Sequence, residues 1–148
     1  MKQIITVISI LFFSCESKQL AIEPGVSWEL AEHRKQTITN VQYEIELDIP
    51  RDIDAPIYGI ETIRFQLLKS SRDIILDFRQ PSNYIRNVTV KGKAIDYKVQ
   101  SEHIILAAEH FKKGENEITI QFRAGDMSLN RNQEFLYTLF VPERAATA

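Results

Sequence analysis

The sequence contains few of the residue types that carry catalysis, metal binding or covalent cross-linking. Its 148 residues include one cysteine and three histidines, and no two of the histidines lie four residues apart. A lone thiol has no partner for a disulfide or a metal cluster, and no His-Glu-x-x-His motif is present to hold zinc. The sequence also lacks a Gly-x-Ser-x-Gly elbow and a glycine-rich phosphate loop. We therefore predict no catalytic residues, no metal site and no cofactor within this chain.

The charge of the chain has no strong bias toward either sign. Its 18 lysines and arginines oppose 20 aspartates and glutamates, which gives a net charge of −2. The basic residues are spread along the sequence and do not gather in a stripe. Nucleic acid is therefore not an expected partner, because its binding needs a concentrated basic surface.

Long apolar runs are also scarce, and the most extended one is at the N-terminus. A short basic start precedes an apolar stretch from Ile4 to Phe13, and Ser14-Cys15 follows. This run is too short to span a bilayer, which needs about 20 residues. A basic start, an apolar run and a small residue before the processing point are typical of a secretory signal.

Cys15 stands where a bacterial lipoprotein is cleaved and acylated. Residues 1–15 are accordingly interpreted as a lipoprotein-type signal peptide with lipidation at Cys15. This predicts an exported protein that is anchored in the membrane of the cell envelope. A plain secretory signal with an incidental cysteine is the alternative. The lack of any possible internal disulfide accords with a bacterial envelope protein stabilised by its core alone.

Residues 16–36 are predicted to form a tether followed by a short helix. Ser27 is a suitable N-cap because its hydroxyl can accept a hydrogen bond from a free first-turn N–H. The helix is expected to end near Lys35, and a helix this short needs tertiary contacts. The residues expected to supply those contacts are Trp28 and Leu30 or Ala31.

Residues 37–148 carry the alternation typical of β-strands. From Val41 to Ile49 every second residue is apolar and those between are polar, which predicts a half-buried strand with one wet face. Gly59 is expected at a bulge or close approach, and Gly92 at a tight turn that needs a positive φ. Further strands are expected at residues 57–68, 73–78, 88–90, 94–99, 103–106 and 118–122.

About seven or eight short strands, with turn signals roughly every ten residues, predict an all-β fold. We expect an antiparallel β-sandwich, or saddle-shaped double sheet, with one short N-terminal helix. The chain ends on an apolar run from Phe135 with no cap or polar tail. Because a terminal strand of this kind leaves backbone groups unpaired, the β-sandwich domain of residues 37–148 is expected to be truncated at its C-terminal end.

Few polar residues are candidates for a site. Glu44, Glu46 and Asp48 share one strand face and could hold calcium, although three carboxylates on a wet face are more commonly only solvated. Tyr43 falls in the apolar register of its strand, so no aromatic platform for sugars is predicted. The histidines, which are expected at the surface, are His33, His103 and His110.

A series of short motifs follows the order and spacing of a known family. They read GVSWELAEHR at 25–34, ITNVQYEIELDIP at 38–50, GIETIRF at 59–65, ILDF at 75–78, VTVKG at 88–92, GENEITIQF at 114–122, and the closing run from Tyr137. Together they resemble the opening of the bacterial zinc aminopeptidases of the aminopeptidase N family.

The resemblance implies the N-terminal β-domain of such an enzyme, which walls one side of the active-site cleft and packs on a catalytic domain absent from this chain. The full-length parent would bind zinc and cleave peptide N-termini, whereas this piece alone would be inactive. Its partners would be the missing catalytic domain and the parent's peptide substrate. Glu143 is the candidate for holding the substrate's α-amino group.

Two other functions remain open from the residues alone. One is a self-sufficient exported β-sandwich lipoprotein that acts as a binding module and holds a partner or glycan by its loops. The other is an independent hydrolase, which the missing catalytic constellation disfavours.

Acylation of Cys15 can be tested directly. We expect Cys15→Ala to release the protein from the membrane fraction, because the variant cannot carry a lipid chain. Fractionation of cells that express each form, followed by detection of the chain, measures this. Unchanged membrane retention of the variant would contradict lipidation at this residue.

Overall fold

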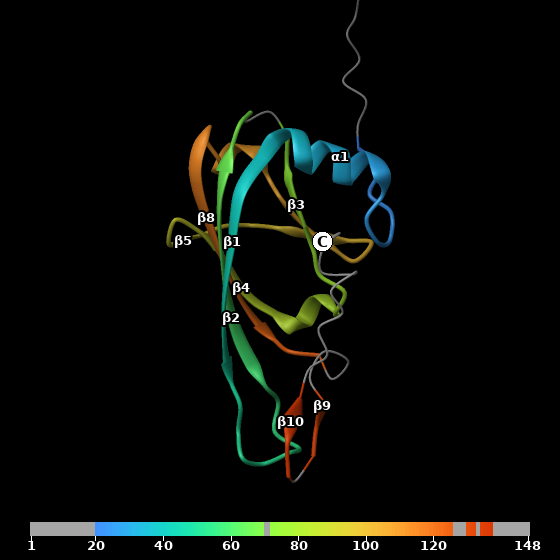
Figure 1. The fold of residues 1–148 in the computed structure, drawn as a ribbon, viewed down its shortest axis with the longest axis vertical. Coiled ribbons are helices and arrows are strands. Elements are labelled where there is room, and N and C mark those ends of the chain that lie inside the picture. Colours follow the sequence, from blue (N-terminus) through green and yellow to red (C-terminus); the bar gives the residue numbers. More distant parts are fainter. Residues whose placement is uncertain (1–19, 70–71, 126–129, 133, 138–148) are drawn as a thin grey trace, which may run out of the picture.

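The computed structural model describes residues 20–69, 72–125, 130–132 and 134–137. These residues form an all-β sandwich of two antiparallel sheets, with a short helix across one end and a small hairpin at the other (Figure 1). The predicted fold class is confirmed. Within the described residues, no helix is long and apolar enough to cross a membrane, and Cys15 and Glu143 lie outside them.

The wider sheet has five strands and the narrower one has three. The wide sheet has the order β1-β2-β8-β4-β5, with β1 at Ile38–Asp48, β2 at Tyr58–Leu67, β8 at Gly114–Arg123, β4 at Ile85–Val90 and β5 at Lys93–Ala94. The narrow sheet has the order β3-β7-β6, with β3 at Ile74–Asp77, β7 at His103–Leu106 and β6 at Lys98–Gln100. The hairpin pairs β9, Asn130–Arg131, with β10, Leu136–Tyr137. Single 3₁₀ turns span Ser82–Tyr84 and Ala108–His110.

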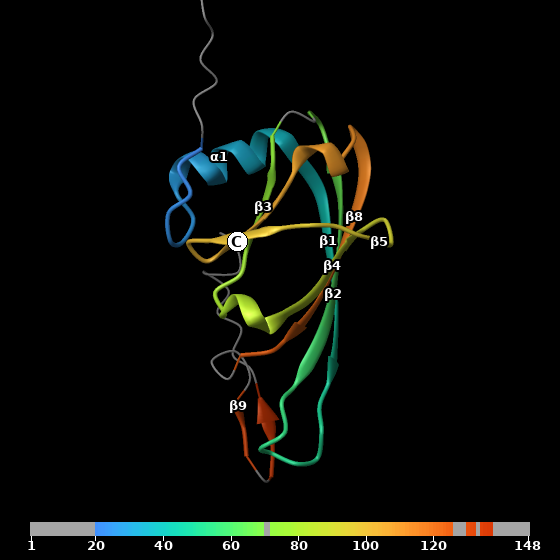
Figure 2. The ribbon, with the colours of Figure 1, turned by 180° about the vertical axis from the view of Figure 1, so that it is seen from behind.

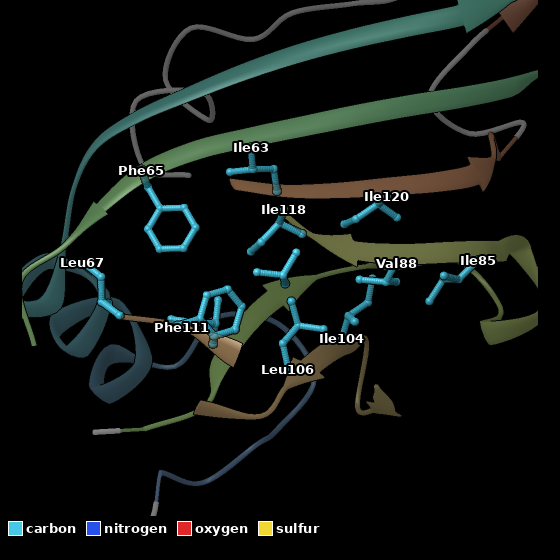
Figure 3. Close-up of a cluster of buried hydrophobic side chains, with 12 residues drawn as sticks. Ile63, Phe65, Leu67, Ile85, Val88, Ile104, Leu106, Phe111, Ile118 and Ile120 are labelled. Carbon is cyan, nitrogen blue, oxygen red and sulfur yellow. The ribbon is translucent and has the colours of Figure 1, made fainter. Parts of the chain in front are cut away.

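The core lies between the two sheets. Strand β2 sends Ile63, Phe65 and Leu67 inward, and β8 adds Ile118 and Ile120 beside them. Figure 3 shows these side chains in one cluster with residues of the narrow sheet. Alternate residues of β2 and β8 are therefore buried, as expected for sheets packed face to face. Other members of the cluster are Ile74, Ile85, Val88, Val90, Ile104, Leu106 and Phe111.

The helix α1, Trp28–Thr37, begins as predicted. The Ser27 hydroxyl accepts a hydrogen bond of 3.1 Å from the Leu30 N–H. Leu30 is buried, but Trp28 is 79% exposed, so the expectation that Trp28 packs the helix is wrong. The helix crosses the end of the sandwich (Figures 1 and 2).

The turn at Lys91-Gly92 is as tight as predicted. Both residues have positive φ, 49° and 76°, which is the two-residue hairpin geometry that matches the twist of flanking strands. The strand expected at 94–99 is broken, however. Ala94 pairs in the wide sheet, where the Ile95 N–H also donates to the Val88 carbonyl, whereas Lys98 begins β6 in the narrow sheet. The intervening residues carry the chain from one sheet to the other.

Strand β1 departs most from its prediction. It forms one edge of the wide sheet, and the structure leaves nearly all of its residues exposed on both faces. The narrow sheet has too few strands to cover every strand opposite it, and β1 is the strand left uncovered. The expected half-buried strand with one wet face is therefore wrong, because amphipathic alternation does not guarantee a covering layer.

Gly59 is a position of close approach, as predicted. A Cβ atom placed there would lie 2.5 Å from the Phe122 ring and 3.0 Å from a Leu47 methyl. We expect Gly59→Ala to destabilise the fold by about 1–3 kcal/mol, the usual cost of overpacking. Urea unfolding measures the change.

The double variant Gly59→Ala/Phe122→Leu supplies the control for this prediction. A smaller side chain at position 122 makes room for the added methyl, so the two changes together should cost less than their sum. Strict additivity of the two free-energy changes would contradict the clash.

Candidate functional site

The inner face of β1 carries a row of uncovered apolar side chains, which we call the apolar row. Tyr43 is 66% exposed and Ile45 is 57% exposed, although both point to the same side of the sheet as the buried Ile63. Contiguous exposed apolar residues mark interaction surfaces more often than isolated ones do. The members of the apolar row are Val41, Tyr43, Ile45 and Leu47.

A groove of about 380 Å³ continues from the apolar row into the sandwich. It lies between the β1 edge of the wide sheet and the β3 edge of the narrow sheet, and α1 closes one end. Figure 1 shows these three elements on the same side of the molecule. We call it the open groove. Its lining includes Val41, Tyr43, Ile63, Phe65, Ile74 and Ile75.

The outer face of β1 is acidic. Glu44, Glu46 and Asp48 alternate with the apolar row, and only Glu44 has an ion pair among the described residues. Its carboxylate lies 2.8 Å from Arg64, which also bonds Glu117 at 2.9 Å. No cluster of three or more potential metal ligands occurs within the described part of the chain. The three carboxylates form a strip along the outer face of β1.

Glu61 lies on the inner face, where its neighbours are apolar. Its register partners are Ile45 on β1 and Ile120 on β8. No ion pair or hydrogen bond joins its carboxylate to another described residue, and burial raises its pKa above the ordinary value. A partner that covered this face would bury the carboxyl further, so a basic group on that partner would be favoured beside it.

A polar network holds α1 and the preceding segment to the narrow sheet. Arg34 of α1 bonds both carboxylate oxygens of Asp77 on β3, at 2.7 and 3.0 Å, and the Ile75 carbonyl at 2.8 Å. His103, which is paired with Asp77 in register, is only 1% exposed. Its Nε2 lies 3.0 Å from the Glu23 carbonyl and 2.9 Å from the Gly25 carbonyl. Both oxygens can only accept, so Nε2 carries a proton and donates.

The other ring nitrogen of His103 faces Asp77. Nδ1 lies 3.0 Å from Oδ1, which is within ion-pair distance, although Nδ1 makes no hydrogen bond with a described residue. Partial burial alone would raise the pKa of Asp77. The hydrogen-bonded Arg34 guanidinium and the nearby His103 outweigh burial and hold that pKa below its usual value.

The structure corrects the predicted positions of the histidines. His103 was expected at the surface but is buried, because it lies in the covered narrow sheet. His33 and His110 are half-buried. Burial, together with Arg72 and Arg34, lowers the pKa of His33. The network around the buried His103 links residues 23–25, 34, 77 and 103. These residues lie far apart in the sequence, so no local pattern reveals the network.

A second hollow of about 620 Å³ lies where the β9–β10 hairpin meets the loop between β1 and β2. The Arg131 guanidinium donates to the carbonyls of Pro50, Ile53 and Ala55, and so ties the two segments together. Phe135 and Tyr137 stack with a centroid separation of 5.8 Å beside this hollow and are half exposed. This hollow adds aromatic surface, but the described residues lining it include no histidine, cysteine or methionine.

The comparisons with known proteins point away from peptidases. A family model described as "Heme-binding protein Shr-like, Hb-interacting domain" matches residues 65–124, which is less than half of the chain. The matched segment runs from the end of β2 through β8 and so includes the whole narrow sheet. No match was found among the curated proteins.

This match contradicts the resemblance to the aminopeptidase N family. The interpretation as the non-catalytic N-terminal domain of a zinc aminopeptidase is wrong, and the expected catalytic domain and peptide substrate of that enzyme no longer have support. The motifs behind it were alternating strands and turns, which many β-sandwiches share. The matched description names interaction with hemoglobin, which favours the alternative of a binding module.

The polar network predicts a defined acid sensitivity. Asp77 has a lowered pKa in the folded protein, so its contribution to stability is complete above about pH 4, the ordinary range of an unfolded aspartate. That contribution is lost as the pH falls further, through the lowered pKa. Asp77→Ala should cost about 1 kcal/mol at pH 7, because it removes the partly exposed bidentate pair with Arg34 and the charge that faces the buried His103. The difference between the two proteins should shrink below pH 4 in urea unfolding.

Asp96→Ala is the matched control, because Asp96 is exposed and has no ion pair among the described residues. Its effect should stay within about 0.5 kcal/mol and show no such pH dependence. Equal effects of the two substitutions would contradict the role assigned to the network.

Proposed function

We propose that this protein is a non-catalytic binding module and that hemoglobin is its protein partner. The observation that carries the proposal is the apolar row on β1, whose side chains are exposed although they belong to the inner face of the sandwich. The description of the matching family names hemoglobin interaction and so supports this partner. Export and acylation of Cys15 stay predictions that would place the module outside the cytoplasm.

The surface has the composition of a protein interface. Aromatic and aliphatic anchors surrounded by polar residues contribute most of the affinity in such interfaces. Tyr43 and Ile45 stand between the open groove and the acidic outer face of β1. A partner seated there would cover apolar atoms that the narrow sheet leaves in water, which favours association.

The open groove does not fit heme itself. An axial ligand to heme iron is usually a histidine, cysteine, methionine or tyrosine. His103 is buried, with both ring nitrogens facing protein oxygens. Among the residues that line the open groove, Tyr43 is of a type that can ligate heme iron. Partial burial and, as a smaller effect, the nearby Glu61 carboxylate raise the pKa of Tyr43 and so disfavour its phenolate form. The proposed partner is therefore the globin protein and not free heme.

Binding to the apolar row can be measured by biolayer interferometry with the full chain and purified hemoglobin. We expect Tyr43→Ala/Ile45→Ser to weaken binding at least tenfold, because it removes two anchors of a kind that dominates interface energies. Both side chains are more than half exposed, so the fold should persist, and thermal unfolding checks this.

Ile60→Ser is the matched control, since Ile60 is a partly exposed apolar residue on the opposite face of the same sheet. It should bind like the parent chain. Titration with hemin should produce no absorbance change that indicates axial ligation. Absence of hemoglobin binding, or equal loss in both variants, would contradict the proposal.

A further inference from the structure

We propose that β1 receives its partner as an added β-strand, and that the added segment alternates apolar with basic side chains. The inference rests on the proposed function. Because the globin fold is helical, the added segment would be an extended terminus or loop of the partner rather than part of its helices. Strand β1 is 11 residues long and pairs only with β2 among the described residues. Its other edge therefore offers backbone N–H and C=O groups to an incoming strand.

The two faces of β1 define the side chains that would suit such a strand. Across a strand pair, directly opposed residues lie on the same face and contact each other. Residues added beside Tyr43 and Ile45 would extend the apolar inner face toward the open groove. Residues added beside Glu46 and Asp48 would meet carboxylates that have no ion pair among the described residues. Lysine or arginine is complementary there.

A second copy of this chain is a poor occupant of the same edge. Two β1 strands paired edge to edge would bring the outer carboxylates of each copy together, and like charges opposed across strands are destabilising. The same carboxylates are a common device against self-pairing of edge strands. They disfavour pairing with an acidic strand and favour pairing with a basic one, so charge complementarity selects the partner.

The start of β1 limits where the added strand can pair. Asn40 has a φ of 53°, and the register with β2 shifts between Thr39 and Gln42. An irregularity of this kind bends a strand and interrupts its ladder. Regular pairing is therefore available from Gln42 to Asp48, which is the segment that carries Tyr43, Ile45 and the unpaired carboxylates.

The test uses the full chain, labelled with ¹⁵N, and the synthetic peptide Lys-Val-Lys-Tyr-Lys-Val-Lys with blocked ends. We expect saturable binding, with amide shift changes and slowed hydrogen exchange concentrated in β1 and β2. A peptide of the same composition in block order, Lys-Lys-Lys-Lys-Val-Tyr-Val, should bind at least tenfold more weakly. So should the alternating peptide with methylated backbone nitrogens, because it cannot donate hydrogen bonds to β1.

Charge-reversed variants separate this edge from the general charge of the protein. Glu46→Lys/Asp48→Lys should weaken binding of the alternating peptide at least tenfold and should gain affinity for Glu-Val-Glu-Tyr-Glu-Val-Glu. Asp96→Lys/Glu109→Lys changes the net charge equally, and both residues are exposed and lie outside β1 and β2. This control should stay within twofold of the parent chain.

Equal binding of the block-order peptide, equal loss in the control variant, or shift changes centred outside β1 and β2 would each overturn the strand-addition proposal. Hemoglobin binding measured on the same variants keeps the two proposals apart. If Tyr43→Ala/Ile45→Ser loses hemoglobin while Glu46→Lys/Asp48→Lys retains it, the binding function stands and strand addition fails. If the peptide binds as expected and hemoglobin does not, strand addition stands and the assigned partner fails.

Discussion

The difference in width between the two sheets is the constraint on which the rest of the structure depends. Three strands face five, so the core closes where the narrow sheet lies opposite β2, β8 and β4, and β1 is left without a cover. Because β1 keeps the alternation of a covered strand, its apolar side chains remain exposed. The open groove and the free edge both follow from this single mismatch, which explains why the candidate surface lies on this side of the molecule.

The helix that closes one end of the groove is held by apolar burial and by charge together. Leu30 is the buried apolar residue of α1, and the fork of hydrogen bonds from Arg34 to Asp77 supplies the directional contact. Bidentate pairs of this type fix orientation as well as distance. His103 extends the same network to the backbone before α1. The position of α1 at the mouth of the groove thus depends on an ion pair as well as on apolar packing.

Much of the fold could be predicted from the sequence because the signals are local. The Ser27 cap, the alternation in β1 and β2, the Lys91-Gly92 turn and the close approach at Gly59 each depend on a few neighbouring residues. The coverage of β1 and the burial of His103 depend on how many strands the opposite sheet has, which no local pattern encodes. The turn at Ser101-Glu102 could not be predicted from the sequence, for a different reason. Both residues have positive φ without glycine, so the usual turn signal is absent.

The alternation of charge along β1 also bears on fibril formation. In a cross-β fibril identical strands stack in register about 4.7–4.8 Å apart, so each outer carboxylate of β1 would stand directly above its own copy. This repulsion grows with every chain that joins, so in-register stacking of β1 is disfavoured although the apolar row by itself has the pattern of a dry zipper. The same strip of carboxylates that favours a basic partner strand therefore also opposes polymerisation along this long edge.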